Sequence, residues 1–180
     1  MNKEITIILL SHKSKNLVLD FIKDIYVKYK IIIIDNSNDI DLKDIIHKNF
    51  PEVLIDIIEN NGYGSPINYA SKLVTTKYFL ISNPDISGLN EININKFLDA
   101  AKILNDNFSA LGPRFVNANP KSLTQSDNKK NIEEMKFISG SCMFFKKKNF
   151  DLIGGFDEKF FLYFEESDFC LRSHKLKKNY

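Results

Sequence analysis

The sequence predicts an α/β fold with a mostly parallel sheet flanked by helices, and three observations support this prediction. Short apolar runs rich in β-branched residues, such as Ile5–Leu10 and Ile31–Ile34, are typical of strands buried on both faces. These runs alternate with segments of helical periodicity, and polar turn-forming residues follow several of them. Strand–helix–strand units of this kind join parallel strands through right-handed crossovers.

The first such unit covers the N-terminal part of the chain. Ile5–Leu10 is expected to be a strand that ends at Ser11. Between positions 17 and 26, apolar residues recur three and four positions apart, which predicts an amphipathic helix with Ser14 as its N-cap. The second strand, Ile31–Ile34, stops at Asp35–Asp39, a cluster of turn formers.

The same alternation continues to the C-terminus, and we therefore expect a single domain over residues 1–180. Residues 117–131 are polar, lack apolar periodicity and predict a surface loop. The remaining expected elements are a helix near Leu42–His47, a strand at Val53–Ile58, a helix at Pro66–Val74, a strand at Tyr78–Ile81, a helix at Ile94–Leu104, short strands at Ala110–Pro113 and Lys136–Phe145, and a helix from Glu165.

Composition narrows the class of protein. A length of 180 residues with 43% hydrophobic residues suffices for one buried core, and a formal net charge of +2 gives no support to nucleic-acid binding. Cys142 and Cys170 lie in apolar surroundings without metal-ligand spacing, which favours buried thiols in a reducing compartment. We find no signal peptide and no apolar run long enough to cross a bilayer. We expect a cytoplasmic protein with at most peripheral membrane contact, through Lys175–Lys178 at the inner face of the cytoplasmic membrane.

Polar clusters follow three of the expected strands. They are Ser11–His12, Asp35–Ser37 and Asn83–Asp85, and the Asn61–Asn68 loop is expected to reach the same edge. In open α/β sheets, ligands bind outside the carboxyl ends of the strands, which makes this edge the candidate site. Each cluster taken alone is more often simple turn chemistry.

Taken in order along the chain, these clusters and three later segments form a recognisable series. The segments after Asn83–Asp85 are Ile138–Met143, Gly154–Phe161 and Glu165–Arg172, and the last two are the most specific. The series resembles glycosyltransferase family 2, which has the GT-A fold, and is nearest to the rhamnosyltransferase-like members. The resemblance covers essentially the whole chain. It implies inverting transfer of a sugar from a nucleotide-diphosphate sugar to a glycan or lipid-linked acceptor in bacterial surface-polysaccharide synthesis.

The resemblance also implies a donor site with a divalent ion, Mg²⁺ or Mn²⁺. Asp85 matches the last carboxylate of the family's Asp-X-Asp metal motif, whereas Asn83 replaces the first carboxylate with a neutral amide. Asp35 matches a residue that faces the base, and its acceptor oxygens suit the imide N–H of uracil or thymine, favouring a UDP- or dTDP-sugar. The implied nucleotide-sugar site comprises Ser11, Asp35, Asn36, Asn61, Gly62, Asn68, Asn83, Gly140, Asp168 and Arg172.

The catalytic residues implied by the resemblance open the last predicted helix. Relatives carry a Glu-Asp pair there, and its second member takes the acceptor's proton. Here the pair is Glu165–Glu166, so Glu166 is the candidate base and Glu165 its rival. Asp168 and Arg172 are four residues apart and suit a salt bridge that orients the helix or contacts phosphate. Without the resemblance, an acidic helix start favoured by the helix dipole is the simpler interpretation.

Two other functions stay open. The chain ends shortly after the segment with the candidate base, so we expect a minimal or C-terminally truncated member of the family. The first alternative is therefore a truncated remnant that binds nucleotide without catalysis. The second is a sugar-phosphate nucleotidyltransferase, but such enzymes resemble a Gly-rich phosphate loop after the first strand, and Ser11–Lys15 contains no glycine.

Overall fold

A computed structural model describes residues 2–115 and 132–177, whose strands form a five-stranded sheet in the order β3-β2-β1-β4-β5. The first four strands along the chain are parallel, and β5 runs antiparallel to β4. The predicted mostly parallel sheet is thus confirmed. The strands are β1 (Asn2–Ser11), β2 (Tyr29–Asp35), β3 (Leu54–Ile57), β4 (Tyr78–Ser82) and β5 (Cys142–Lys146).

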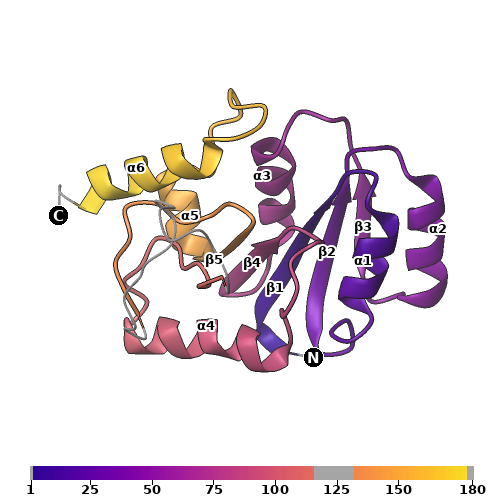
Figure 1. Cartoon of the computed structure of the whole chain (residues 1–180), viewed down its shortest axis with the longest axis horizontal. Helices are drawn as coiled ribbons and strands as arrows, with labels where there is room; N and C mark the ends of the chain where they lie inside the picture. The colour runs from indigo at the N-terminus through magenta and orange to yellow at the C-terminus, as the bar shows by residue number, and fades with distance from the viewer. Residues whose placement is uncertain (1, 116–131, 178–180) are drawn as a thin grey trace.

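Helices cover both faces of this sheet (Figure 1). Residues from α1, α2 and α4 join the core on one face, and residues from α3, α5 and α6 join the core on the other. Neighbouring residues of β2 alternate between these two cores, which explains why its isoleucines form an unbroken run. The helices are α1 (Lys15–Ile22), α2 (Ile40–Asn49), α3 (Gly64–Leu73), α4 (Glu91–Ile103), α5 (Lys147–Ile153) and α6 (Glu165–Lys177).

Aromatic packing fixes α6 against the sheet. Phe169 of α6 meets Phe145 of β5 with ring centroids 5.3 Å apart and Phe150 of α5 at 5.5 Å. All three rings are buried, and such pairs contribute about 0.5–1.5 kcal/mol each beyond the burial of their area. The start of α6, which carries Glu165 and Glu166, is therefore held firmly by the core.

Several local predictions differ from the structure. The first helix ends at Ile22 instead of continuing to Tyr26, because residues 23–28 form turns in which Ile25 is nevertheless buried. Residues 110–113 contribute only an isolated bridge between Leu111 and Phe144. The strand expected to begin at Lys136 begins at Cys142, since residues 139–141 turn the chain.

Helix α5 was not predicted, because its seven residues directly follow β5 and are too few to show a helical periodicity. Gly154 and Gly155 both have positive φ and turn the chain at the end of α5. The expected loop at 117–131 lies outside the described residues. Within the described part of the chain, no helix is long and apolar enough to cross a membrane.

Candidate functional site

The polar clusters predicted at the strand ends lie at one edge of the sheet. Ser11 and Asp35 are paired residues at the carboxyl ends of β1 and β2, and the Asn36 amide donates to the Ser11 carbonyl at 3.0 Å. β4 is the other neighbour of β1 and runs parallel to it, so Asn83 and Asp85 leave the sheet at the same edge. The strand order reverses between β1 and β4, which is the position where open α/β sheets bind ligands.

Asp35 is fully buried and holds the turn that follows β2. Its Oδ1 accepts hydrogen bonds from the backbone amides of Ser37 and Asp39, at 2.9 and 3.0 Å. The Ser37 hydroxyl donates to Oδ2 at 3.0 Å. Asp39 in turn caps α2 by accepting from the Leu42 amide at 2.9 Å. A direct contact between Asp35 and a base stays a prediction, whereas its support of this turn is visible in the structure.

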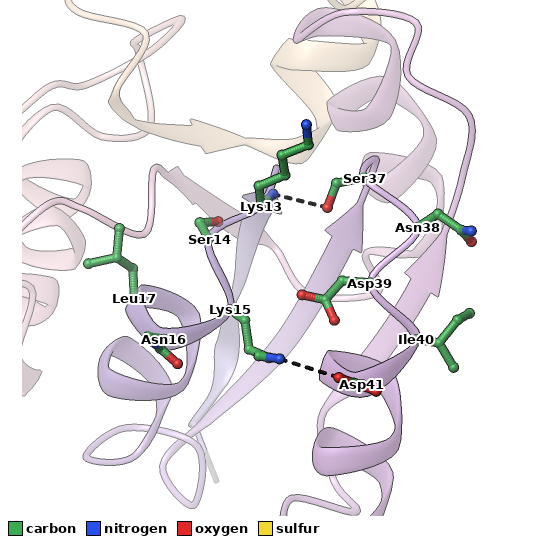
Figure 2. A pocket seen from close by; sticks show the side chains of 10 residues that line it. All are labelled: Lys13, Ser14, Lys15, Asn16, Leu17, Ser37, Asn38, Asp39, Ile40 and Asp41. Carbon is green, nitrogen blue, oxygen red and sulfur yellow. Dashed lines mark hydrogen bonds and ion pairs between the residues drawn. The ribbon is translucent and has the colours of Figure 1, made fainter.

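A hollow of about 680 Å³ lies between the β1–α1 and β2–α2 turns (Figure 2). Ser14, Lys15 and Asp39 point toward its middle in this view, whereas Asn38 and Ile40 point away from it. Ser14 occupies the N-cap position of α1 as predicted, but its hydroxyl bonds to the Ser11 hydroxyl instead of capping the helix. Asp35 shapes one wall of the hollow through the turn that it supports.

A side-chain network joins the three loops that follow β1, β2 and β3. The Asn36 carboxamide oxygen pairs with the His12 ring at 2.9 Å, and its nitrogen donates to Asn60 at 3.1 Å and to the Gly62 carbonyl at 3.4 Å. Asn36 is buried, so the network fixes the loops relative to one another. Asn61, which was expected in the donor site, is exposed at the rim of this network.

Gly62 allows the loop before α6 to approach the loop before α3. Its φ is +92°, and a Cβ at this position would lie 1.9 Å from the Phe161 carbonyl oxygen, so no other residue fits without rearrangement. The chain beyond Phe161 is exposed from Leu162 to Phe164. Tyr163 and Phe164 both have positive φ, a strained conformation for aromatic residues that is found mainly at functional sites.

The two glutamates at the start of α6 have different surroundings. Glu165 is 4% exposed, and its Oε2 has no hydrogen-bond partner among the described residues. Burial, and then the nearby Glu166 carboxylate, raise the pKa of Glu165 above its usual range. Glu166 is half-buried, and its side chain lies against Gly140, where a Cβ would be 3.4 Å from the Glu166 Cβ and Cγ. Glu166 is thus the more accessible of the two.

Two other predicted site residues hold segments of the chain together. Asn68 of α3 donates to the Phe156 carbonyl at 2.8 Å and accepts from the Phe156 amide at 2.9 Å. Arg172 forms the expected salt bridge with Asp168 at 2.7 Å and also donates to the carbonyls of residues 153 and 155, both at 2.6 Å. The contacts of Arg172 hold α6 against the chain after α5, and those of Asn68 hold Phe156 against α3. Contacts of either residue with a nucleotide stay predictions.

The β4 edge offers a limited set of ligands for a divalent ion. Asp85 is exposed, and the amide oxygen of Asn83 is the other oxygen ligand of this motif. No group of three or more His, Cys, Asp or Glu able to hold a metal occurs among residues 2–115 and 132–177. One carboxylate fits an ion such as Mg²⁺, which keeps several waters and is bound chiefly by the phosphates of its substrate.

Sequence reasoning missed two features of this edge. Lys13 and Lys15 line the hollow. The sequence feature that could have indicated this is the pair of basic residues shortly after the first strand. Tyr63 donates from its hydroxyl to the Gly140 carbonyl at 2.8 Å. Its only signal was its place inside the Asn61–Gly64 segment, because a contact across 77 residues leaves no mark on local sequence.

Comparison with known proteins identifies chains of the same fold. No family model matches the sequence. The structure is similar to S. aureus TarS 1–349 in complex with UDP, with a TM-score of 0.71 and 15% identity over 94% of this chain and 54% of that chain. It is also similar to a mannosyltransferase from Pyrobaculum calidifontis in complex with GDP-Man and Mn²⁺. The TM-score is 0.67 and the identity 17%, over 94% of this chain and 51% of that chain. The fold is therefore GT-A-like.

One curated relative is similar along nearly the whole chain. It is the low-salt glycan biosynthesis hexosyltransferase Agl10 of Haloferax volcanii, which is 24% identical over 202 residues, covering 97% of this chain and 63% of the relative. The chain thus spans less than two thirds of this relative and about half of the solved structures.

Proposed function

We propose that this protein is a glycosyltransferase that moves a sugar from a nucleotide-diphosphate sugar to a glycan or lipid-linked acceptor. One observation carries the proposal: a turn at residues 139–141 brings the candidate base beside the Asn83–Asp85 loop. Gly140 lies against Glu166, and the Ser141 carbonyl accepts from the Asn83 amide at 2.9 Å. Three similar proteins support the same chemistry: one is named a hexosyltransferase, one a mannosyltransferase in complex with GDP-Man and Mn²⁺, and one is in complex with UDP.

The donor is assigned to the edge over β1, β2 and β4. Its nucleoside lies at the hollow beside Ser11 and the turn held by Asp35, where Lys13 supplies positive charge. Its diphosphate lies toward Asp85, the residue that would hold Mg²⁺ or Mn²⁺ together with Asn83. The bound ion would neutralise charge that develops on the departing diphosphate. A uridine or thymidine nucleotide is the proposed donor, because the resemblance matches Asp35 to a residue that faces the base and one similar structure is a complex with UDP.

The transfer is an inverting displacement in which Glu166 serves as general base. The acceptor hydroxyl oxygen forms a bond to the anomeric carbon while the bond from that carbon to the diphosphate oxygen breaks. The hydroxyl proton passes to the Glu166 carboxylate, and the nucleoside diphosphate leaves. Glu165, buried and with a raised pKa, is less suited to accept this proton in exchange with solvent. The reaction takes place in the cytoplasm, on a surface-polysaccharide pathway.

Donor binding followed by transfer tests this function. UDP-, dTDP- and GDP-sugars are screened by thermal unfolding with and without Mn²⁺, and a donor at about 100 times its Kd should raise Tm by roughly 5–10 °C. The stabilising donors are then supplied with lipid-linked and free glycan acceptors, and transferred sugar is measured by mass spectrometry. Failure of every nucleotide sugar to stabilise the protein contradicts the proposal. Binding without transfer favours a nucleotide-binding protein that has no catalytic activity.

A further inference from the structure

The turn at Ser139–Ser141 is the point where three distant parts of the candidate site meet. On one side, the Ser141 carbonyl bonds to the Asn83 amide and thereby to the loop of Asp85. On a second side, Gly140 packs against the side chain of Glu166. On the third side, the Gly140 carbonyl accepts from the Tyr63 hydroxyl. The position of Glu166 relative to Asp85 therefore depends on this turn.

Tyr63 is the side chain that reaches the turn from the opposite loop. It sits at the N-cap position of α3, and its amide donates to the Phe161 carbonyl at 2.9 Å, which fixes the start of its side chain. Burial, and then the carboxylates of Glu165, Glu166 and Asp85 together with the Cys142 thiol, raise the pKa of the Tyr63 phenol. The phenol thus stays protonated and keeps donating to Gly140.

Gly140 itself lies close to the side chain of Glu166. The φ angle of Gly140 is not positive, so alanine is compatible with the backbone at this position. A Cβ there would lie 3.4 Å from both Cβ and Cγ of Glu166, at the lower limit of ordinary van der Waals contact. A side chain on residue 140, or a shift of its backbone toward α6, would therefore press on the glutamate.

We propose that Tyr63 is a positioning residue, which holds the Gly140 turn so that the Glu166 carboxylate stays at a fixed place relative to Asp85. This inference rests on the proposed function, because it gives Tyr63 a role in setting up the base. Tyr63 acts through the turn and needs no contact with the reacting atoms. It is expected to influence the rate of transfer more than the binding of the donor.

The test compares Tyr63→Phe with Tyr69→Phe. Each variant loses one tyrosine hydroxyl, from α3 or from its N-cap position. The Tyr69 hydroxyl bonds to Asp56 of β3, which is far along the chain from the turn at Ser139–Ser141. We expect Tyr63→Phe to lower kcat roughly threefold to tenfold, the worth of one neutral hydrogen bond, without changing donor affinity. Hydrogen exchange at Ser141 and Asn83 should become faster in the same variant. Tyr69→Phe should leave kcat and exchange unchanged.

A second variant addresses the contact between turn and base. Gly140→Ala should lower kcat by a similar factor, and the Tyr63→Phe/Gly140→Ala double variant should lose less than the product of the two single losses, because both act on one turn. Loss of donor affinity with kcat intact in Tyr63→Phe, or exchange equal to that of Tyr69→Phe, overturns the proposal.

The two proposals fail in different ways. Absence of transfer by the wild-type protein contradicts the proposed function, and hydrogen exchange then still decides whether Tyr63 holds the turn. Exchange that becomes faster in Tyr63→Phe alone supports the positioning of the turn, whereas equal exchange in both variants contradicts it.

Discussion

The two halves of the sheet's carboxyl edge treat their acidic residues differently. Over β1 and β2, the buried Asp35 carboxylate accepts from two backbone amides and one hydroxyl of its own turn. Over β4 and α6, Asp85 is exposed and the buried Glu165 retains an oxygen without a partner. The first half uses its carboxylate to build a loop, whereas the second half leaves the Asp85 carboxylate exposed and one oxygen of Glu165 buried without a hydrogen bond to any described residue. Residue type alone does not distinguish the two uses.

The largest expected effect separates the two glutamates of α6. Glu166→Gln should lower transfer by roughly 10²–10⁴-fold, the usual worth of a general base, because glutamine cannot accept the acceptor's proton. Donor affinity, measured by calorimetric titration, should stay near the wild-type value. The isosteric Glu165→Gln serves as control and should retain most activity. A greater loss of kcat in Glu165→Gln would move the assignment of the base by one residue.

The second prediction tests whether Asp35 is mainly a builder of its loop. Asp35→Ala leaves the amides of Ser37 and Asp39 without their acceptor, and should lower the free energy of unfolding by about 1–3 kcal/mol. Nucleotide affinity should fall with it, because the wall of the hollow loosens. Urea unfolding and ligand titration measure the two effects.

Asp85→Ala is the matched control for this prediction. Because Asp85 is exposed, the change should leave stability within about 0.5 kcal/mol while abolishing the dependence of donor binding on divalent ions. Equal stability losses in the two variants would remove the distinction between the two halves of the edge.

The smallest expected effect concerns the pH dependence of stability. The pKa of Glu165 is raised in the folded protein, chiefly by burial. The folded protein therefore binds the proton of this carboxyl group more tightly than the unfolded chain does. This contribution to stability is complete below the unfolded pKa of about 4.3 and is lost as pH rises through the folded pKa. Glu165→Gln should therefore flatten the decline of Tm between acidic and neutral pH. If the dependence of Tm on pH is unchanged in this variant, protonation of Glu165 does not contribute to the pH dependence of stability.

Much of the fold could be predicted from the pattern of apolar residues. The run Ile31–Ile34 predicted a strand buried on both faces, and its side chains do alternate between two cores. The strand expected from Lys136 was placed too early, because the turn at 139–141 is held by contacts with Tyr63 and Asn83 that lie far away in sequence. The short helix α5 depends on the packing of Phe150 against Phe145 and Phe169, which local periodicity does not report.

In the candidate site, too, features that depend on local pattern were predicted from the sequence, and features that depend on distant contacts were not. The sequence placed Ser11, Asp35 and Asp85 at one edge, because the ends of parallel strands meet there. The salt bridge between Asp168 and Arg172 also followed from helical spacing alone. The additional bonds of Arg172 to the 153–155 backbone and the clamp that Asn68 forms on Phe156 did not, since they join elements that are remote along the chain.

By itself, the sequence determined the layers of the fold, the edge that carries the candidate site and the residue types available there. These properties follow from burial and from the direction of the chain, which act over a few residues at a time. Only the tertiary structure decided which carboxylates are consumed by their own loops, as Asp35 is, and which stay open, as Asp85 does. Asp35 is held by amides only two and four residues away, in a turn whose form local sequence did not predict. The places of the other acidic residues depend on contacts between remote segments, such as the hydrogen bond between Tyr63 and Gly140, 77 residues apart.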